Sequence, residues 1–126
     1  MFASLLRCYA LLWYNKGQSK GEGTLEQKII ALPRLDNLTP TMESTALKLM
    51  EEAGELAQAI GKLRGLSGEQ VHVDSAAVRT AITRELLDVA QTAVSLMFVL
   101  EEQYGVDIQQ ALEEHIAKLR AKGYIK

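Results

Sequence analysis

Residues 84–100 read RELLDVAQTAVSLMFVL, and this stretch decides the fold. After its opening Arg-Glu pair, Asp88 is the only charged residue, and apolar side chains point nearly all the way round a helix drawn through it. A helix that is apolar on every side is covered by its neighbours. We predict a long, buried helix that begins at an N-cap, Asp74 or Ser75, and ends where Gly105 supplies a left-handed position.

A second long helix is predicted before this one, from Pro40 to about Arg64. Thr39 is the expected N-cap, because proline is favoured at the first helical position. The apolar residues recur every three or four positions, which is typical of one face of an α-helix. We expect this face to pack inward; it comprises Ala46, Leu49, Met50, Ala53, Leu56, Ala57, Ile60 and Leu63.

A third helix is predicted from Asp107 to about Ala121, ended by Gly123. No stretch shows the strict alternation of a strand, and about ten residues join the two long helices, which favours an antiparallel pair. The predicted fold class is all-α: a helical bundle whose two long antiparallel helices carry the acidic positions. Three helices cannot cover an apolar helix fully, so we expect completion by oligomerisation, as a homodimer or homotetramer.

The N-terminal part of the chain is predicted to be a separate feature. Residues 2–14 favour a short helix, and a polar, glycine-rich linker follows, so residues 1–24 are interpreted as an appendage. Leu25–Leu32 is expected to form another short helix stopped by Pro33. The bundle domain is assigned to residues 25–126.

Composition limits the possible functions. The chain has 126 residues, with 48% apolar and 24% charged residues, as expected for one globular domain. A net charge of −2 gives no attraction to a nucleic acid polymer. The single cysteine, Cys8, excludes an internal disulfide and a thiolate zinc site and suits a cytoplasmic protein. The apolar N-terminal stretch is too short to span a bilayer, so no membrane partner is expected.

Two pairs of carboxylates share the same helical spacing. Each pair lies at positions i and i+3, on one side of its predicted helix. Two helices that face each other would bring the four together: Glu52, Glu55, Glu85 and Asp88.

The two pairs differ in how easily they are explained without a ligand. Glu52 lies at the border of its apolar face and could simply pair with Lys48, on an ordinary solvated face. Asp88 lies among apolar side chains, and a buried, unpaired carboxylate costs several kcal/mol or more. It must therefore be protonated, paired or bound to a cation. Oxygen-only ligands suit Mg²⁺, with Mn²⁺ as an alternative, and Mg²⁺ usually shares its ligands with phosphates.

The segments KLMEEAGELAQAI (residues 48–60) and ELLDVAQTAV (residues 85–94) resemble the EExxE and ExxD motifs of MazG-like nucleotide pyrophosphohydrolases, members of the all-α NTP pyrophosphatase superfamily. The similarity covers roughly residues 40–124, including the closing EEHIAKLRAKGY. The resemblance implies hydrolysis of a nucleoside triphosphate to the monophosphate and pyrophosphate.

The resemblance also implies roles for individual residues. The Mg²⁺ ligands would be Glu52, Glu55, Glu85 and Asp88. Glu51 would be an additional ligand or a base outside the ligand shell, so the catalytic candidates are Glu51, Glu52 and Glu55. Candidate contacts to the outer phosphates are Lys48, Lys118, Arg120 and Lys122, although basic residues also favour helix C-termini for electrostatic reasons alone.

Two other functions remain open at this stage. The first is a phosphoribosyl-ATP pyrophosphatase, which shares the superfamily and its acidic motifs. The second is a metal-free helical interaction module, in which the acidic residues are surface charges or meet a partner's basic residues.

Overall fold

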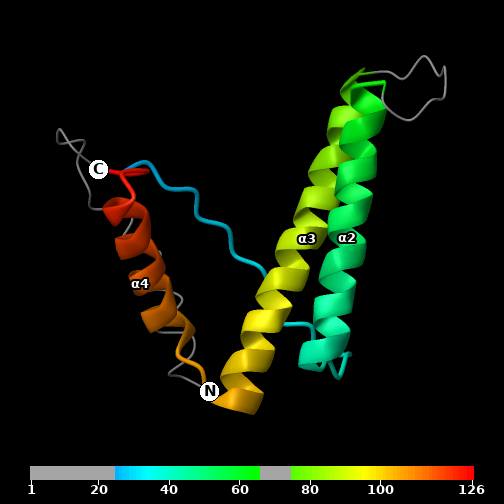
Figure 1. The fold of residues 1–126 in the computed structure, drawn as a ribbon. Helices are drawn as coiled ribbons and strands as arrows, with labels where there is room; N and C mark the ends of the chain where they lie inside the picture. Colours follow the sequence, from blue (N-terminus) through cyan, green and yellow to red (C-terminus); the bar gives the residue numbers. More distant parts are fainter. Residues whose placement is uncertain (1–24, 66–74) are drawn as a thin grey trace. The chain divides into compact units, whose positions relative to one another are not determined.

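The computed structural model describes residues 25–65 and 75–126. That part of the chain contains three helices and no strand: α2 (Met42–Leu63), α3 (Ser75–Tyr104) and α4 (Ile108–Ala121) (Figure 1). The all-α prediction is confirmed. The predicted appendage over residues 1–24 and the predicted N-cap at Asp74 lie outside the described residues.

The chain divides into two compact units, which we describe separately. One unit comprises Ile30–Lys118 and contains α2 and α3. The described residues of the other are 25–29 and 119–126. Within the first unit, α2 and α3 lie side by side and run in opposite directions, which confirms the predicted antiparallel pair (Figure 1).

Helix α2 begins two residues later than the sequence predicted. Thr41, rather than Thr39, is the N-cap: its hydroxyl accepts a hydrogen bond from the Ser44 amide (3.1 Å), and the Ser44 hydroxyl accepts one from the Thr41 amide (3.0 Å). This reciprocal capping box satisfies two of the amides at the start of the helix. The Pro40 carbonyl is instead used in a tertiary contact described below.

The other helix ends agree with the predicted signals. Gly105 follows α3 with a φ of 65°, a conformation that is strained for residues with a Cβ. Asp107 caps α4, because its Oδ1 accepts a hydrogen bond from the Gln110 amide (2.9 Å). At the other end of α4, Gly123 has a φ of 74°, and the amide of Tyr124 closes the last turn on the Leu119 carbonyl (3.0 Å).

The short helix predicted over Leu25–Leu32 is absent: residues 25–32 have no helical structure. Eight residues before a proline provide too few backbone hydrogen bonds to offset the cost of nucleating a helix.

Residues 33–40, here called the 33–40 segment, run along α3 and are attached to it at both ends. Gln91 Nε2 donates a hydrogen bond to the Pro33 carbonyl (2.8 Å), and Gln103 Nε2 donates one to the Pro40 carbonyl (3.0 Å). Arg34 adds a two-pronged ion pair with Glu102, in which both nitrogen–oxygen distances are 3.0 Å. The two glutamines of α3 therefore fix the prolines that begin and end the segment.

The contact between α2 and α3 follows a heptad-like pattern. On α2 the less exposed residues are spaced four, three, four and three apart: Thr45, Leu49, Glu52, Leu56 and Ala59. On α3 the same spacing relates Val78, Ile82, Glu85, Val89, Thr92, Leu96 and Val99, all buried or half-buried. This spacing is typical of two helices packed at a small angle. We call these two rows the seam.

The prediction of which side of α2 packs against the other helix was wrong. Only Leu49 and Leu56 of the predicted face lie in the seam, whereas Ala46, Met50, Ala53, Ala57 and Ile60 are exposed. One partner helix covers only a narrow stripe, so most of the wide apolar face of α2 remains uncovered in the single chain.

The expected burial of Asp88 is also contradicted. Its side chain is exposed in the described chain, while Glu52 is the carboxylate that becomes buried. Asp88 lies beside the seam rather than in it, and the one partner helix covers only a narrow stripe of α3.

Candidate metal centre and adjoining cavities

The seam places a carboxylate where a helix pair normally has an apolar residue. Glu52 is only 7% exposed. A buried charge needs compensation, and Lys48, one turn earlier on α2, provides it: Lys48 Nζ lies 2.8 Å from Glu52 Oε1 and 3.1 Å from Glu51 Oε1. These hydrogen bonds, that to Glu52 first, raise the pKa of Lys48 above its ordinary value, so it stays protonated.

Three of the four predicted carboxylates converge across the seam. Glu52 from α2 and Glu85 and Asp88 from α3 each offer an oxygen, and these oxygens lie within 4.8 Å of one another. Opposite ligands of Mg²⁺ are about 4.2 Å apart, since each bond is about 2.1 Å long. Adjacent ligands are about 3.0 Å apart, so the three side chains would need to close by up to about 1.8 Å to share one ion. Within the described part of the chain, this oxygen-only group fits a hard divalent cation.

Glu55, the fourth predicted ligand, lies next to this group but outside it. Its side chain is exposed. The negative charge of Glu52, followed by partial desolvation and the charge of Glu85, raises the pKa of the Glu55 carboxyl above its ordinary range. The negative charges of these neighbours therefore make Glu55 take up a proton more readily than an isolated glutamate would.

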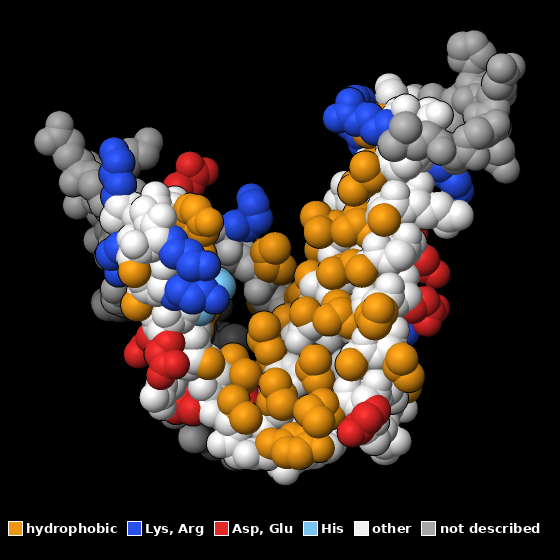
Figure 2. All heavy atoms as spheres, in the orientation of Figure 1, with side chains coloured by type: hydrophobic (Ala, Val, Ile, Leu, Met, Phe, Trp, Pro, Cys, Tyr) orange, Lys and Arg blue, Asp and Glu red, His pale blue; other side chains and the backbone are white. Residues whose placement is uncertain are grey.

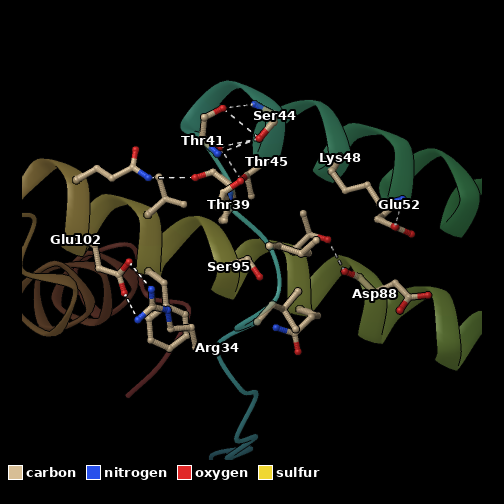
Figure 3. Close-up of a pocket in the computed structure, with 18 residues that line it drawn as sticks. Arg34, Thr39, Thr41, Ser44, Thr45, Lys48, Glu52, Asp88, Ser95 and Glu102 are labelled. Carbon is tan, nitrogen blue, oxygen red and sulfur yellow. Dashed lines mark hydrogen bonds and ion pairs between the residues drawn. The ribbon is translucent and has the colours of Figure 1, made fainter.

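A large cavity begins at the carboxylates and extends along α3 beneath the 33–40 segment (Figure 3). Its volume is about 920 Å³, near the upper end of the ~300–1,000 Å³ range of small-molecule sites. Lys48, Glu52 and Asp88 line one end, and Arg34 and Glu102 line the other. The residues between them are mainly apolar or uncharged: Leu35, Leu38, Thr41, Ser44, Thr45, Thr92, Ser95, Phe98 and Val99.

A smaller cavity of about 330 Å³ also adjoins the carboxylates. Glu55 and Glu85 line it, together with Gln58 and Lys62. The four predicted metal ligands are thus divided: Glu52 and Asp88 contact the large cavity, and Glu55 and Glu85 contact the small one.

The remaining predicted site residues do not gather at either cavity. Glu51 is exposed, and its one described contact is with Lys48. Lys118 lies on α4, and Arg120 and Lys122 lie at or just beyond its end. None of these four lines the two cavities.

Several cavity residues were missed by sequence reasoning. Lys62 could have been found, because it lies seven residues after Glu55 and so on the same side of α2. Ser95 and Thr45 lie at positions that an apolar pattern assigns simply to packing. Arg34 lies in a segment that looked like an ordinary loop; the hydrogen bonds from Gln91 and Gln103 and its own ion pair with Glu102 place it at the cavity.

The fold and the site define a class: an all-α protein with an oxygen-only candidate metal centre between two antiparallel helices. The family model for the MazG nucleotide pyrophosphohydrolase domain matches residues 40–123. The chain therefore belongs to the MazG nucleotide pyrophosphohydrolase family. No curated protein and no solved structure matches the chain.

The matched region contains α2, α3 and α4 and all the carboxylates described above. The family generally depends on a divalent metal, and Glu52, Glu85 and Asp88 form a group able to hold one. None of the helices in the described ranges has the length and apolar character needed to cross a membrane.

Proposed function

We propose that the protein is a Mg²⁺-dependent nucleoside triphosphate pyrophosphohydrolase that converts a (d)NTP to the (d)NMP and pyrophosphate, with Mn²⁺ as a possible substitute. The observation that supports this most strongly is the convergence of Glu52, Glu85 and Asp88 within the region matched by the family model. In the reaction, the oxygen of a water bonds to the α-phosphorus, the α–β anhydride bond breaks, and pyrophosphate leaves with the bonding electrons.

Glu52, Glu85 and Asp88 hold the metal in this proposal. When bound, the ion supplies charge neutralisation at the phosphate oxygens and lowers the pKa of a water. The seam holds Glu52 rigidly because its side chain is buried and paired with Lys48. The more exposed Asp88 can adjust its position as substrate enters.

Glu55 is our candidate for the group that accepts the water's proton, with a contribution to metal binding as its second role. Its pKa is raised by Glu52, and a carboxylate with a raised pKa is a better base than an ordinary glutamate. Glu51, the other candidate, already forms an ion pair with Lys48 (3.1 Å) and lines neither cavity.

Lys48 is our preferred phosphate contact, because it lines the large cavity beside Glu52. A phosphate oxygen could replace Glu51 as its second partner. Lys118, Arg120 and Lys122 remain candidates for outer phosphates.

A substrate panel tests this function. Purified protein would be assayed for pyrophosphate release from the eight common NTPs and dNTPs and from phosphoribosyl-ATP, each with Mg²⁺ or Mn²⁺. We expect metal-dependent turnover of at least one NTP or dNTP. Turnover of phosphoribosyl-ATP alone would assign the rival activity within the superfamily.

Two variants test the site. Glu85→Gln and Asp88→Asn keep the side-chain size but remove a charge, and each should lower kcat at least ~100-fold without loss of helical content. If both variants keep activity within a few fold, the site assignment is wrong. If the wild-type protein binds no Mg²⁺ or Mn²⁺ by calorimetry and releases no pyrophosphate, a non-catalytic helical module is the better reading.

We further propose that the protein acts as a homodimer or homotetramer. Large apolar side chains on α2 and α3 are exposed, including Leu47 (71%), Met50 (75%) and Leu86 (52%). Hydrophobic side chains cover much of the face that these helices present in Figure 2. Contiguous apolar surface of this kind favours association. A monomeric mass at micromolar concentration would refute this part.

A further inference from the structure

The large cavity has features that the carboxylates alone do not explain. It extends from Asp88 to Gln103 along α3, which is 15 residue steps or about 22 Å of helix. A metal ion and its phosphates need only the acidic end. Apolar atoms form most of the remaining surface, and uncharged polar side chains (Ser, Thr and Gln) are interspersed among them, which suits a pocket that binds an organic ligand with hydrogen-bonding groups.

Ser95 lies midway along this cavity, between the acidic end and the Arg34–Glu102 pair (Figure 3). Its Oγ is buried and has no hydrogen-bond partner, the one such side-chain atom among the described residues. Other α3 hydroxyls are satisfied by the helix itself: Thr92 Oγ1 donates to the Asp88 carbonyl (2.9 Å) and Thr83 Oγ1 to the Arg79 carbonyl (2.9 Å). A buried hydroxyl without a partner carries a cost that a ligand could remove.

The opposite wall is held in place by neutral hydrogen bonds. Because Gln91 and Gln103 use their Nε2 groups on the Pro33 and Pro40 carbonyls, the 33–40 segment spans the cavity as a wall attached at both ends. The amide oxygen of Gln91, which also lines the cavity, accepts none of the described hydrogen bonds and can accept one from a ligand. Phe98 is the one aromatic residue in the lining.

From these observations we propose that the nucleoside part of the substrate binds between α3 and the 33–40 segment, with its phosphates directed to the acidic end. Rotation about the Ser95 Cα–Cβ bond turns the buried, unpaired Oγ into the cavity, where it hydrogen-bonds the nucleoside, and Phe98 provides apolar contact for it. This inference rests on the proposed function and identifies the substrate-recognition surface of the same site. The small cavity is lined mainly by charged and polar side chains, among them Glu55, Lys62 and Glu85, so it does not compete for this role.

The test measures binding of α,β-methylene nucleoside triphosphates, which cannot be cleaved at the reacting bond, by calorimetry with Mg²⁺. Ser95→Phe fills the cavity and should weaken this binding at least ~10-fold, because the added ring occupies the nucleoside's space. Ser95→Ala removes only the hydroxyl and should weaken it about 3- to 10-fold. Affinity for Mn²⁺ alone, and for pyrophosphate with Mn²⁺, should stay within about twofold in both variants, since the acidic end is unchanged.

Thr83→Phe is the matched control, because it places the same ring on an exposed position of α3 outside both cavities. Circular dichroism checks that every variant keeps its helices. The inference is overturned if the folded Ser95→Phe and Ser95→Ala variants bind the analogue as the wild type does, or if they lose Mn²⁺ and analogue binding equally. A wild type that binds neither Mn²⁺ nor analogue would refute the proposed function itself, and this inference with it.

Discussion

The two faces of α2 reverse the usual polarity of a helix in a soluble protein. Its inner face, against α3, buries Thr45 and Glu52, whereas its outer face exposes Leu47 and Met50. A helix that served only to build a core would do the opposite. The difference teaches that the inner face of α2 is shaped by the acidic site, and that much of its hydrophobic surface is available for another polypeptide.

Replacing the buried Glu52 should have the largest effect on the contrast between the two faces of α2. Glu52→Leu converts the inner face to an ordinary apolar seam. We expect turnover to fall at least ~100-fold, or about 2.7 kcal/mol of transition-state stabilisation, because a metal ligand is lost. Stability to urea should stay equal or rise, since an apolar side chain replaces a buried charge and Lys48 keeps Glu51 as its partner.

Glu101→Leu is the control for this variant, because it makes the same change at an exposed position of α3. If Glu52→Leu instead unfolds the protein, the ion pair with Lys48 is needed for folding, and the inner face is not shaped by the site alone.

The outer face is tested by Met50→Glu. Burying a methionine contributes about 1.5–3 kcal/mol, and a symmetric interface contains it twice, so a charge here should disrupt association. Sedimentation equilibrium should show the mass falling from a multiple of 13.9 kDa to that of one chain. Met50→Leu keeps the volume and should keep the assembly. An unchanged mass for Met50→Glu would place the interface elsewhere.

A smaller, pH-dependent effect is expected for Glu55→Gln. The folded state raises the pKa of Glu55, chiefly through the charge of Glu52, so ionised Glu55 destabilises the fold. Wild-type stability should therefore increase as the pH falls from 7 through this raised pKa towards the unfolded value of about 4.3. The variant lacks this dependence.

Thermal unfolding without divalent metal is the measurement. The Tm of Glu55→Gln should exceed that of the wild type at pH 7, and the two should converge below about pH 4. Added Mg²⁺ should reduce the difference, because it offsets the repulsion. A lower Tm for the variant at pH 7 in metal-free buffer would contradict this account.

The smallest expected effect is that of Gly54→Ala. Gly54 lies within α2, and a Cβ added there meets nothing within 4 Å. Alanine should stabilise the helix by about 0.5–1 kcal/mol, measurable by urea unfolding. Destabilisation or a smaller assembly would indicate that a second chain approaches α2 closely at this glycine.

The sequence was a good guide to the helices because their ends depend on local chemistry. Gly105 and Gly123 end α3 and α4 as predicted, since only a left-handed backbone closes those turns. The start of α2 was misplaced because two threonines flank Pro40, and the choice between them depends on Ser44 and on the contact from Gln103. Such tertiary contacts leave no periodic signal.

The sequence predicted which residues form the candidate site better than it predicted their burial. The i, i+3 spacing placed Glu85 and Asp88 on one side of α3, and these do meet Glu52. Periodicity could not reveal which stripe of α2 faces α3, because its apolar face is wider than one helix covers. Glu52 was therefore placed at the border of the apolar face, and Glu55 among the converging groups. Asp88 was expected to be buried because α3 is apolar nearly all the way round, but its side chain is exposed in the single chain. Ligand roles for all four stay predictions.

The attachment of the 33–40 segment has a consequence for substrate exchange. Two of its three anchors are neutral amide hydrogen bonds, and the third, Arg34–Glu102, joins side chains that are 57% and 42% exposed. Such exposed pairs contribute little and are screened by salt. The rate at which this wall opens should therefore be almost constant with ionic strength, whereas capture of the phosphates at the acidic end should vary with it. A change in salt concentration would then alter the rate of phosphate binding but leave the rate of nucleoside entry almost unchanged.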